Sequence, residues 1–206
     1  MNTTIYLVRH GKTDKTKLVQ NDVELFGNKE VDLDESFIPQ IEALSDRLKL
    51  YEIENVYSSN FIRAKKTANI LSKGKNVKVD NRLGERIGGT PNLDITPIQY
   101  YKMQFDDPNY KFPDGESIND IIARMRDAFN DILNENKGGE ALVVSHGAAI
   151  TFFLKKWCMV DLIDAENKIR RFSFRGKVFH EGVVNFIMCF KLTFNDDNEL
   201  EDIEVV

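Results

Sequence analysis

The sequence has 206 residues, of which 42% are hydrophobic and 30% are charged, and this composition indicates a globular protein that forms one domain with a substantial core. The formal net charge of −5 argues against a nucleic-acid partner held by bulk electrostatics, so a site for an anion has to be a local group of cations. No apolar stretch is long enough to cross a bilayer, no signal-peptide pattern is found, and the two cysteines suggest neither a disulfide framework nor a thiolate metal site. We therefore expect a cytoplasmic protein with no membrane partner.

The chain begins with a predicted buried strand that ends in polar residues. Ile5–Val8 is apolar and partly β-branched, and Arg9, His10 and Gly11 follow it directly. Polar groups at the carboxyl end of such a strand lie where open α/β sheets bind ligands. The polar segment 12–29 that comes next is read as a loop.

The next segment predicts a helix, a strand and a second helix. Ser36 is the expected N-cap of the first helix, whose apolar face comprises Phe37, Ile41, Leu44 and Leu48. Ile53–Tyr57 then reads as a strand, and a helix follows over about 61–73. Arg63 lies in the first turn of that helix, directly after the strand.

A third, weaker strand is predicted at Val77–Val79, and the turn after it contains Glu85. The segment 90–116 differs in composition, because it holds four of the five prolines and five aromatic residues. We interpret it as a lid or specificity insertion that includes a short helix near Ile98–Phe105.

The clearest helix begins after its cap Ser117 and ends at Gly138. A buried strand over 141–144 then leads to Ser145, His146 and Gly147, and a helix follows over about 148–158.

The C-terminal part holds a basic stretch, 168–177, read as a solvated face or as an extension of an anion site toward a substrate with a second charge. His180 is left as a surface or structural residue. Two strand-like runs follow at 183–194 and 199–206. Together the elements predict one α/β domain over residues 1–206: a mostly parallel sheet flanked by helices on both faces in three layers, with an antiparallel strand at one edge.

Three strand-to-helix junctions carry the candidate chemistry. The first ends in Arg9 and His10, the second leads to Arg63, and the third contains His146. Parallel strands place these junctions at the same edge of the sheet, so two arginines and two imidazoles meet there. The ligand that best matches them is a phosphoryl group, because guanidinium forks pair with phosphate oxygens; carboxylate and sulfate are weaker alternatives.

Two histidines exceed what binding alone requires. A neutral imidazole can attack phosphorus in line and carry the phosphoryl group, while the second one contacts the equatorial oxygens. A carboxyl group near the rim is then needed to protonate the leaving alkoxide and later to accept a proton from water. Glu85 is the candidate. Three isolated histidines without paired carboxylates indicate no metal site.

The sequence resembles the histidine phosphatase superfamily, also called the phosphoglycerate mutase-like family. The resemblance covers about residues 4–158 and rests on five motifs in the family's order, namely Leu7–Gly11, Tyr57–Ala68, Leu83–Arg86, Gly115–Ser117 and Val144–Gly147. It implies a phosphoglycerate mutase-like fold and a reaction that needs neither a metal nor an organic cofactor.

The resemblance also implies a role for each site residue. His10 is expected to be the nucleophile that becomes phosphohistidine, and Glu85 the general acid and then the general base. The phosphoryl oxygens are expected to contact Arg9, Arg63, His146, Gly147 and Thr16, the last standing roughly where the family commonly has a phosphate-contacting asparagine.

The resulting hypothesis is a cofactor-independent phosphatase that hydrolyses phosphomonoesters through a phosphohistidine. Its partner is expected to be a phosphorylated small molecule, with a phosphoprotein as the alternative, and the protein to be a monomer or homodimer. Two other functions stay open. One is a phosphoglycerate mutase, and the other is a non-catalytic protein that binds or senses a phosphorylated ligand.

Overall fold

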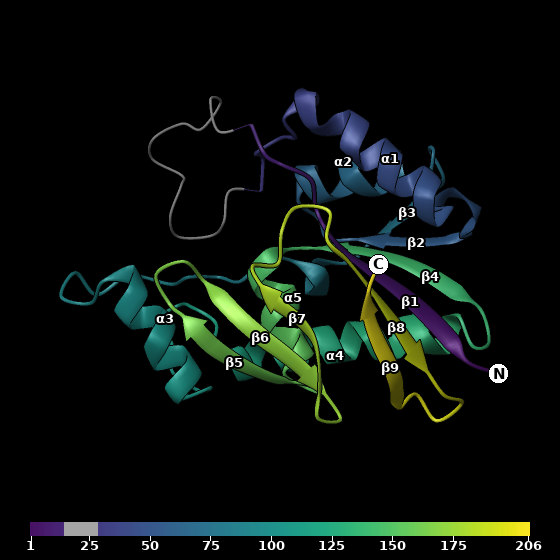
Figure 1. Cartoon of the computed structure of the whole chain (residues 1–206). Coiled ribbons are helices and arrows are strands. Elements are labelled where there is room, and N and C mark those ends of the chain that lie inside the picture. Colours follow the sequence, from purple (N-terminus) through teal and green to yellow (C-terminus); the bar gives the residue numbers. More distant parts are fainter. Residues whose placement is uncertain (15–28) are drawn as a thin grey trace.

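The computed structural model describes residues 1–14 and 29–206, and in them a six-stranded sheet runs in the order β3-β2-β4-β1-β8-β9 (Figure 1). Its strands are β1 (Thr3–Arg9), β2 (Asn55–Ser58), β3 (Val77–Val79), β4 (Glu140–Ser145), β8 (Cys189–Phe194) and β9 (Leu200–Val205). The pairings among β1, β4, β2 and β3 are parallel, whereas β8 and β9 continue the sheet antiparallel. This confirms the mostly parallel sheet and its antiparallel C-terminal edge.

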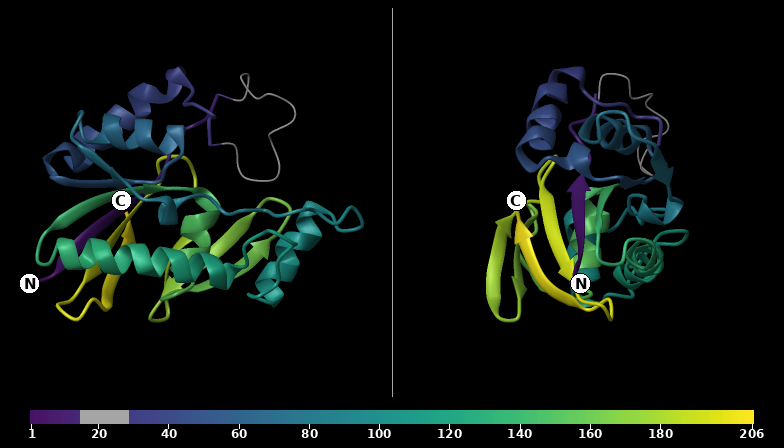
Figure 2. Two further views of the ribbon diagram at one scale, coloured as in Figure 1. Left: turned by 180° about the vertical axis from the view of Figure 1, so that it is seen from behind. Right: turned by 90° about the vertical axis from the view of Figure 1, so that its right-hand side faces the viewer.

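Helices cover both faces of the sheet (Figure 2). One face packs against α1 (Ile38–Leu48) and α2 (Ile62–Leu71), and the other against α4 (Ile118–Glu135) and α5 (Gly147–Leu154). Alternate side chains of β1 divide between the two cores, because successive residues of a strand point to opposite faces: Ile5 and Leu7 join the α4 side, and Val8 joins the α1 side.

The start of the first helix differs from the prediction. A short 3-10 turn, η2 (Glu35–Phe37), precedes α1, and the side chain that caps this turn is Asp34, not Ser36. The Asp34 carboxylate accepts a hydrogen bond from the Ser36 amide at 3.0 Å. The expected cap was wrong because the helical turn begins before Ser36, so Ser36 lies inside it and its hydroxyl donates to the Asp34 carboxylate at 2.6 Å. Two further 3-10 turns are η3 (Leu50–Glu52) and η4 (Asn81–Leu83).

A second sheet follows α5 and was not predicted. Its three antiparallel strands are β5 (Met159–Asp164), β6 (Ile169–Phe174) and β7 (Lys177–Gly182). The expected helix end at 158 and strand start at 183 were therefore wrong, since α5 ends at Leu154 and the next strand of the large sheet begins at Cys189. The adjacent arginines Arg170 and Arg171 interrupt the apolar–polar alternation of β6 and conceal its period of two.

The basic stretch of the sequence is divided by this sheet. Lys168 lies in the β5–β6 turn with a left-handed backbone (φ 55°), and Arg171 is exposed and pairs with Glu181 at 2.7 Å. Arg170, between them, is only 5% exposed. The stretch is thus not one solvated face.

The segment 90–116 leaves and rejoins the domain through a narrow neck. The amide of Thr90 donates to the Pro113 carbonyl at 2.8 Å, and the amide of Glu116 donates to the Ile87 carbonyl at 2.9 Å. Beyond the neck, α3 (Pro97–Asp106) confirms the short predicted helix, with Thr96 as its N-cap. None of the helices in the described ranges is long and apolar enough to span a membrane.

Candidate functional site

The three predicted junctions meet at the carboxyl edge of the large sheet. Arg9 at the end of β1 is in register with Ser145 at the end of β4, and the His10 amide donates to the Ser145 carbonyl at 2.9 Å. From the other side of β4, the Ser59 amide donates to the Val144 carbonyl at 3.1 Å. The central position of β4 therefore brings the segments after β1 and β2 to one place.

His10 is buried with one ring nitrogen directed at a backbone carbonyl. Its Nδ1 lies 2.7 Å from the Gly11 carbonyl oxygen, and since a carbonyl only accepts, Nδ1 carries the proton and Nε2 keeps a lone pair. Arg63 Nε donates to that Nε2 at 3.2 Å. Burial, followed by the positive charge of Arg63, lowers the pKa of His10 well below its usual value, so the ring is neutral at pH 7.

His146 is fully buried beside His10, with ring centroids 4.9 Å apart. Its Nδ1 lies 3.3 Å from Arg63 Nη2, and its Nε2 lies 2.7 Å from the Ser59 hydroxyl. The guanidinium only donates, so Nδ1 accepts and Nε2–H donates to the hydroxyl. Burial, followed by the proximity of the His10 ring and the positive charge of Arg63, lowers the pKa of His146.

Arg63 thus contacts both imidazoles from the first turn of α2. Burial lowers its pKa to about 10, which leaves the guanidinium charged at neutral pH. A cation that is held between two neutral rings in a desolvated pocket is suited to an anionic ligand.

Arg9 approaches the site from the opposite side. Its Nη1 donates to the Val184 carbonyl at 2.5 Å, and its guanidinium carbon lies 4.1 Å from the centre of the Phe186 ring. Its Nε is buried with no hydrogen-bond partner among the described residues. A Cβ on Gly147, the first residue of α5, would lie 3.1 Å from that Nε, so the glycine leaves room for the guanidinium.

Glu85 lies at the N-terminus of α5. One of its carboxylate oxygens accepts from the Ala149 amide at 3.1 Å and from the Arg86 amide at 2.8 Å. Its negative charge raises the pKa of both Arg9 and Arg63 against the larger, lowering effect of burial, so the carboxylate lies within electrostatic reach of the two guanidiniums.

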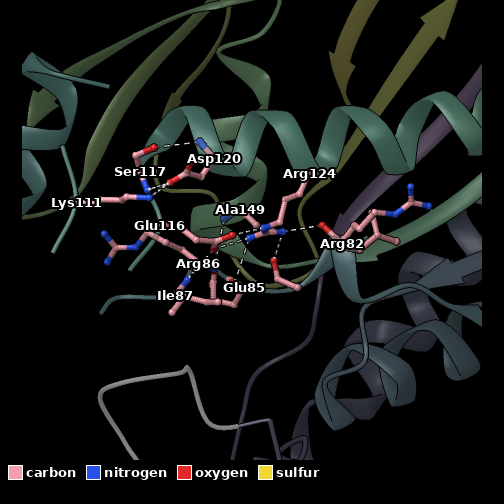
Figure 3. A network of polar contacts seen from close by, with 12 residues as sticks. Arg82, Glu85, Arg86, Ile87, Lys111, Glu116, Ser117, Asp120, Arg124 and Ala149 are labelled. Carbon is pink, nitrogen blue, oxygen red and sulfur yellow. Dashed lines mark hydrogen bonds and ion pairs between the residues drawn. The ribbon is translucent and has the colours of Figure 1, made fainter. Parts of the chain in front are cut away.

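The Glu85 loop is held from α4 by a residue that sequence reasoning missed (Figure 3). Arg124 donates to the carbonyls of Arg82 at 2.6 Å, Gly84 at 3.0 Å and Glu85 at 3.3 Å. The same guanidinium pairs with Glu116 at 2.6 Å, and Glu116 also accepts from the Ile87 amide at 2.9 Å. An arginine on an amphipathic helix gives no sequence signal for such backbone contacts.

A cavity of about 290 Å³ opens beside this loop, and Glu85, Phe61 and Lys29 are among the residues that line it. The Phe61 ring also packs against His146, at 4.5 Å between centroids, so the cavity adjoins the histidine pair.

The sequence analysis also named Thr16, a metal site and His180. Thr16 lies outside the residues that the structure describes. Within the described residues, no group of three or more His, Cys, Asp or Glu side chains is arranged to hold a metal ion. His180 lies on β7, with its Nε2 3.3 Å from the Val183 carbonyl.

Comparison with known proteins relates this arrangement to one family. The model of the histidine phosphatase superfamily (branch 1) matches residues 5–172. The chain is 30% identical over 155 residues to "Probable phosphoglycerate mutase GpmB" from Cronobacter sakazakii (71% of this chain, 70% of that protein), and 29% identical over 157 residues, with the same coverage, to the protein of that name from Photorhabdus laumondii.

Solved structures share the fold at lower identity. A phosphoserine phosphatase mutant from Entamoeba histolytica in complex with phosphoserine superposes with a TM-score of 0.68 at 19% identity, covering 98% of this chain and 96% of that one. A mycobacterial glucosyl-3-phosphoglycerate phosphatase gives 0.66 at 21% identity, with 100% and 97% covered. The family match spans most of the sequence and contains Arg9, His10, Arg63, Glu85 and His146, and it shows that this chain belongs to the histidine phosphatase superfamily.

Proposed function

We propose that the chain is a phosphatase that hydrolyses phosphomonoesters through a phosphohistidine on His10, without a metal or organic cofactor. The observation that supports this most directly is the His10 ring itself. It is buried and neutral, its Nδ1 is held by the Gly11 carbonyl, and its Nε2 lone pair faces Arg63. Those are the requirements of a nucleophile directed at a bound anion.

In the first step of the proposed reaction, the Nε2 lone pair attacks phosphorus. The N–P bond forms as the bond from phosphorus to the leaving oxygen breaks, and the Glu85 carboxyl group gives its proton to that oxygen. In the second step, water attacks phosphorus and gives a proton to Glu85, and the N–P bond breaks to restore neutral His10. Arg9, Arg63 and His146 stabilise the charge on the equatorial oxygens throughout, with Gly147 leaving space for Arg9.

The cavity beside Glu85 supports hydrolysis over phosphoryl transfer between substrate positions. A mutase has to keep water away from its phosphoenzyme, whereas here about 290 Å³ of space adjoins the carboxylate that would activate water. A phosphoglycerate mutase remains the second candidate, because the curated relatives bear that name. The presence of both His10 and Glu85, a nucleophile and a proton donor, disfavours a protein that only binds phosphate.

The test is hydrolysis of p-nitrophenyl phosphate in excess EDTA by the wild-type protein and by His10→Ala. We expect turnover by the wild type, its loss in the variant, and an acid-labile phosphoryl group on the wild type after rapid quenching. His180→Ala is the matched control and is expected to keep full activity, because the hydrogen-bond neighbour of that ring is the Val183 carbonyl and not one of the five site residues.

Four results would contradict the proposal. Activity that requires a metal, or that survives His10→Ala, excludes the phosphohistidine route. Movement of phosphate between the positions of phosphoglycerate without net release favours the mutase. Phosphate binding without any turnover favours the sensor.

A further inference from the structure

A second group of cations gathers around α3, beside the candidate phosphate site. Arg170 on β6 donates through Nε to the hydroxyl of Tyr101, and Arg86, next to Glu85 in sequence, donates to the side-chain oxygen of Gln104. Both acceptors belong to α3. Lys168, in the turn before β6, is the third member. We call Arg86, Lys168 and Arg170 the outer cations.

No carboxylate lies within ion-pair distance of the outer cations in the described part of the chain. By contrast, Arg171 on the same strand and Arg82 have acidic partners, Glu181 and Asp80. Arg170 is the strongest case, because it is 5% exposed and a neutral phenol is its hydrogen-bond acceptor. A buried guanidinium is costly unless an anion compensates it.

The outer cations are connected to the phosphate site through β7 and the segment after it. Arg170 is paired with Gly182 in the β6–β7 ladder, and two residues later the Val184 carbonyl accepts from Arg9. The charge of Arg170 adds to burial in lowering the pKa of Arg9.

Lys168 shows the same proximity. Partial shielding of its ammonium lowers its pKa, and the charges of Arg170, Arg86 and Arg9 lower it further, whereas Glu85 opposes them. The Lys168 ammonium therefore lies within electrostatic reach of the outer cations and also of Arg9 and Glu85 at the phosphate site.

We propose that Arg86, Lys168 and Arg170 form a second anion subsite, and that the substrate is a phosphomonoester that carries a second anionic group, a carboxylate or another phosphate. The phosphoryl group binds between Arg9 and Arg63, and the second anion lies toward α3. The 90–116 segment then acts as a specificity element, because α3 supplies the side chains that orient Arg86 and Arg170. This inference rests on the proposed function only in treating the ligand as a substrate, since its binding can be measured without turnover.

The experiment compares two matched ligand pairs. 3-Phosphoglycerate and glycerol 3-phosphate differ by a carboxylate in place of a hydroxymethyl group, and fructose 1,6-bisphosphate and fructose 6-phosphate differ by a second phosphate. Binding to His10→Ala is measured by calorimetry, and kcat/KM is measured with the protein that retains His10. We expect that, in at least one pair, the ligand with the second anionic group binds about tenfold or more tightly than its partner. Charge-assisted hydrogen bonds contribute free energy of this size.

Lys168→Gln and Arg170→Gln are expected to reduce that preference by about tenfold each while glycerol 3-phosphate and fructose 6-phosphate stay within twofold. Arg171→Gln is the matched control, because it removes the same charge from the adjacent β6 residue, which is exposed and paired with Glu181. Lys168 is exposed and its variant is expected to fold even if the Arg170 variant does not.

The outcomes separate the two proposals. Equal binding of both members of each pair, or a preference that survives Lys168→Gln, overturns the second subsite. A preference in binding without hydrolysis of any ligand supports the subsite and contradicts the proposed phosphatase. Hydrolysis of all four ligands at similar kcat/KM supports the proposed phosphatase and contradicts the second subsite.

Discussion

A single methyl group at Gly147 tests how tightly the site is built. A Cβ at this position would lie 3.1 Å from Arg9 Nε and 3.3 Å from its Cζ, both closer than ordinary contact. The guanidinium has little freedom to retreat, because Nη1 is fixed to the Val184 carbonyl and its plane lies against Phe186. Gly147→Ala is therefore expected to move the Arg9 head group by a few tenths of an ångström.

The magnitude follows from two opposite effects. Misplacement of a binding group by about 1 Å costs about 100-fold in rate, so a shift of a few tenths is expected to lower kcat/KM about tenfold, or about 1.4 kcal/mol of transition-state stabilisation. In contrast, alanine in place of glycine at a helical position stabilises a fold by about 0.5–1 kcal/mol. Strain against Arg9 offsets part of this, so the unfolding free energy should stay within about 0.5 kcal/mol of the wild type.

The assay pairs steady-state hydrolysis of p-nitrophenyl phosphate with urea unfolding of the same preparations. Gly139→Ala is the matched control, because a Cβ there meets its nearest neighbour, the Asn136 carbonyl, at an ordinary 3.5 Å. Activity of Gly147→Ala within twofold of the wild type would refute the reasoning, and so would a loss of activity that is accompanied by destabilisation of several kcal/mol.

Three other predictions concern the acid, its support and the histidine pair. Glu85→Gln should slow alkyl phosphates far more than aryl phosphates, because only a poor leaving group needs the proton; equal slowing would remove Glu85 from that role. Arg124→Met should reproduce this selective slowing at roughly tenfold, since the loop that holds Glu85 loses three carbonyl contacts, and an unaltered alkyl-to-aryl ratio would contradict a positioning role. The pKa values of His10 and His146 are lowered in the folded protein, so below about pH 6.5 the unfolded chain binds protons that the folded chain does not. The unfolding free energy should therefore fall as the pH decreases, by up to about 2.7 kcal/mol per pH unit for the two rings together. Urea unfolding from pH 7.5 to 5.5 measures this, and a slope unchanged in the double variant His10→Asn, His146→Asn would count against it.

The residues gathered at the sheet edge were open to prediction because each follows an apolar run. Arg9 is the last residue of β1, His10 follows it, and His146 follows β4. Recognising these two parallel strands was therefore enough to place the three residues at one edge of the sheet. The burial of alternate strand residues needed no long-range information.

Other features depend on contacts that the local sequence does not encode. Arg124 binds carbonyls about 40 residues away, and any exposed arginine of an amphipathic helix would look the same. Similarly, β5–β7 form a small separate sheet whose outward charges obscure its inward residues, such as Phe172. The cap at Asp34 was missed for a simpler reason, because two neighbouring residues both have side chains able to cap.

The central position of β4 has a consequence for how the protein comes into being. β1 and β2 are each hydrogen-bonded to β4, which lies between them in the sheet, although it is made more than 80 residues after β2. A nascent chain that has not yet reached residue 145 therefore has a gap where its sheet should be continuous, and His10 and Arg63 have no common wall against which to pack. We expect the two imidazoles to meet only when this late strand inserts, so the site assembles in one long-range step near the end of synthesis, as folds rich in non-local pairing do.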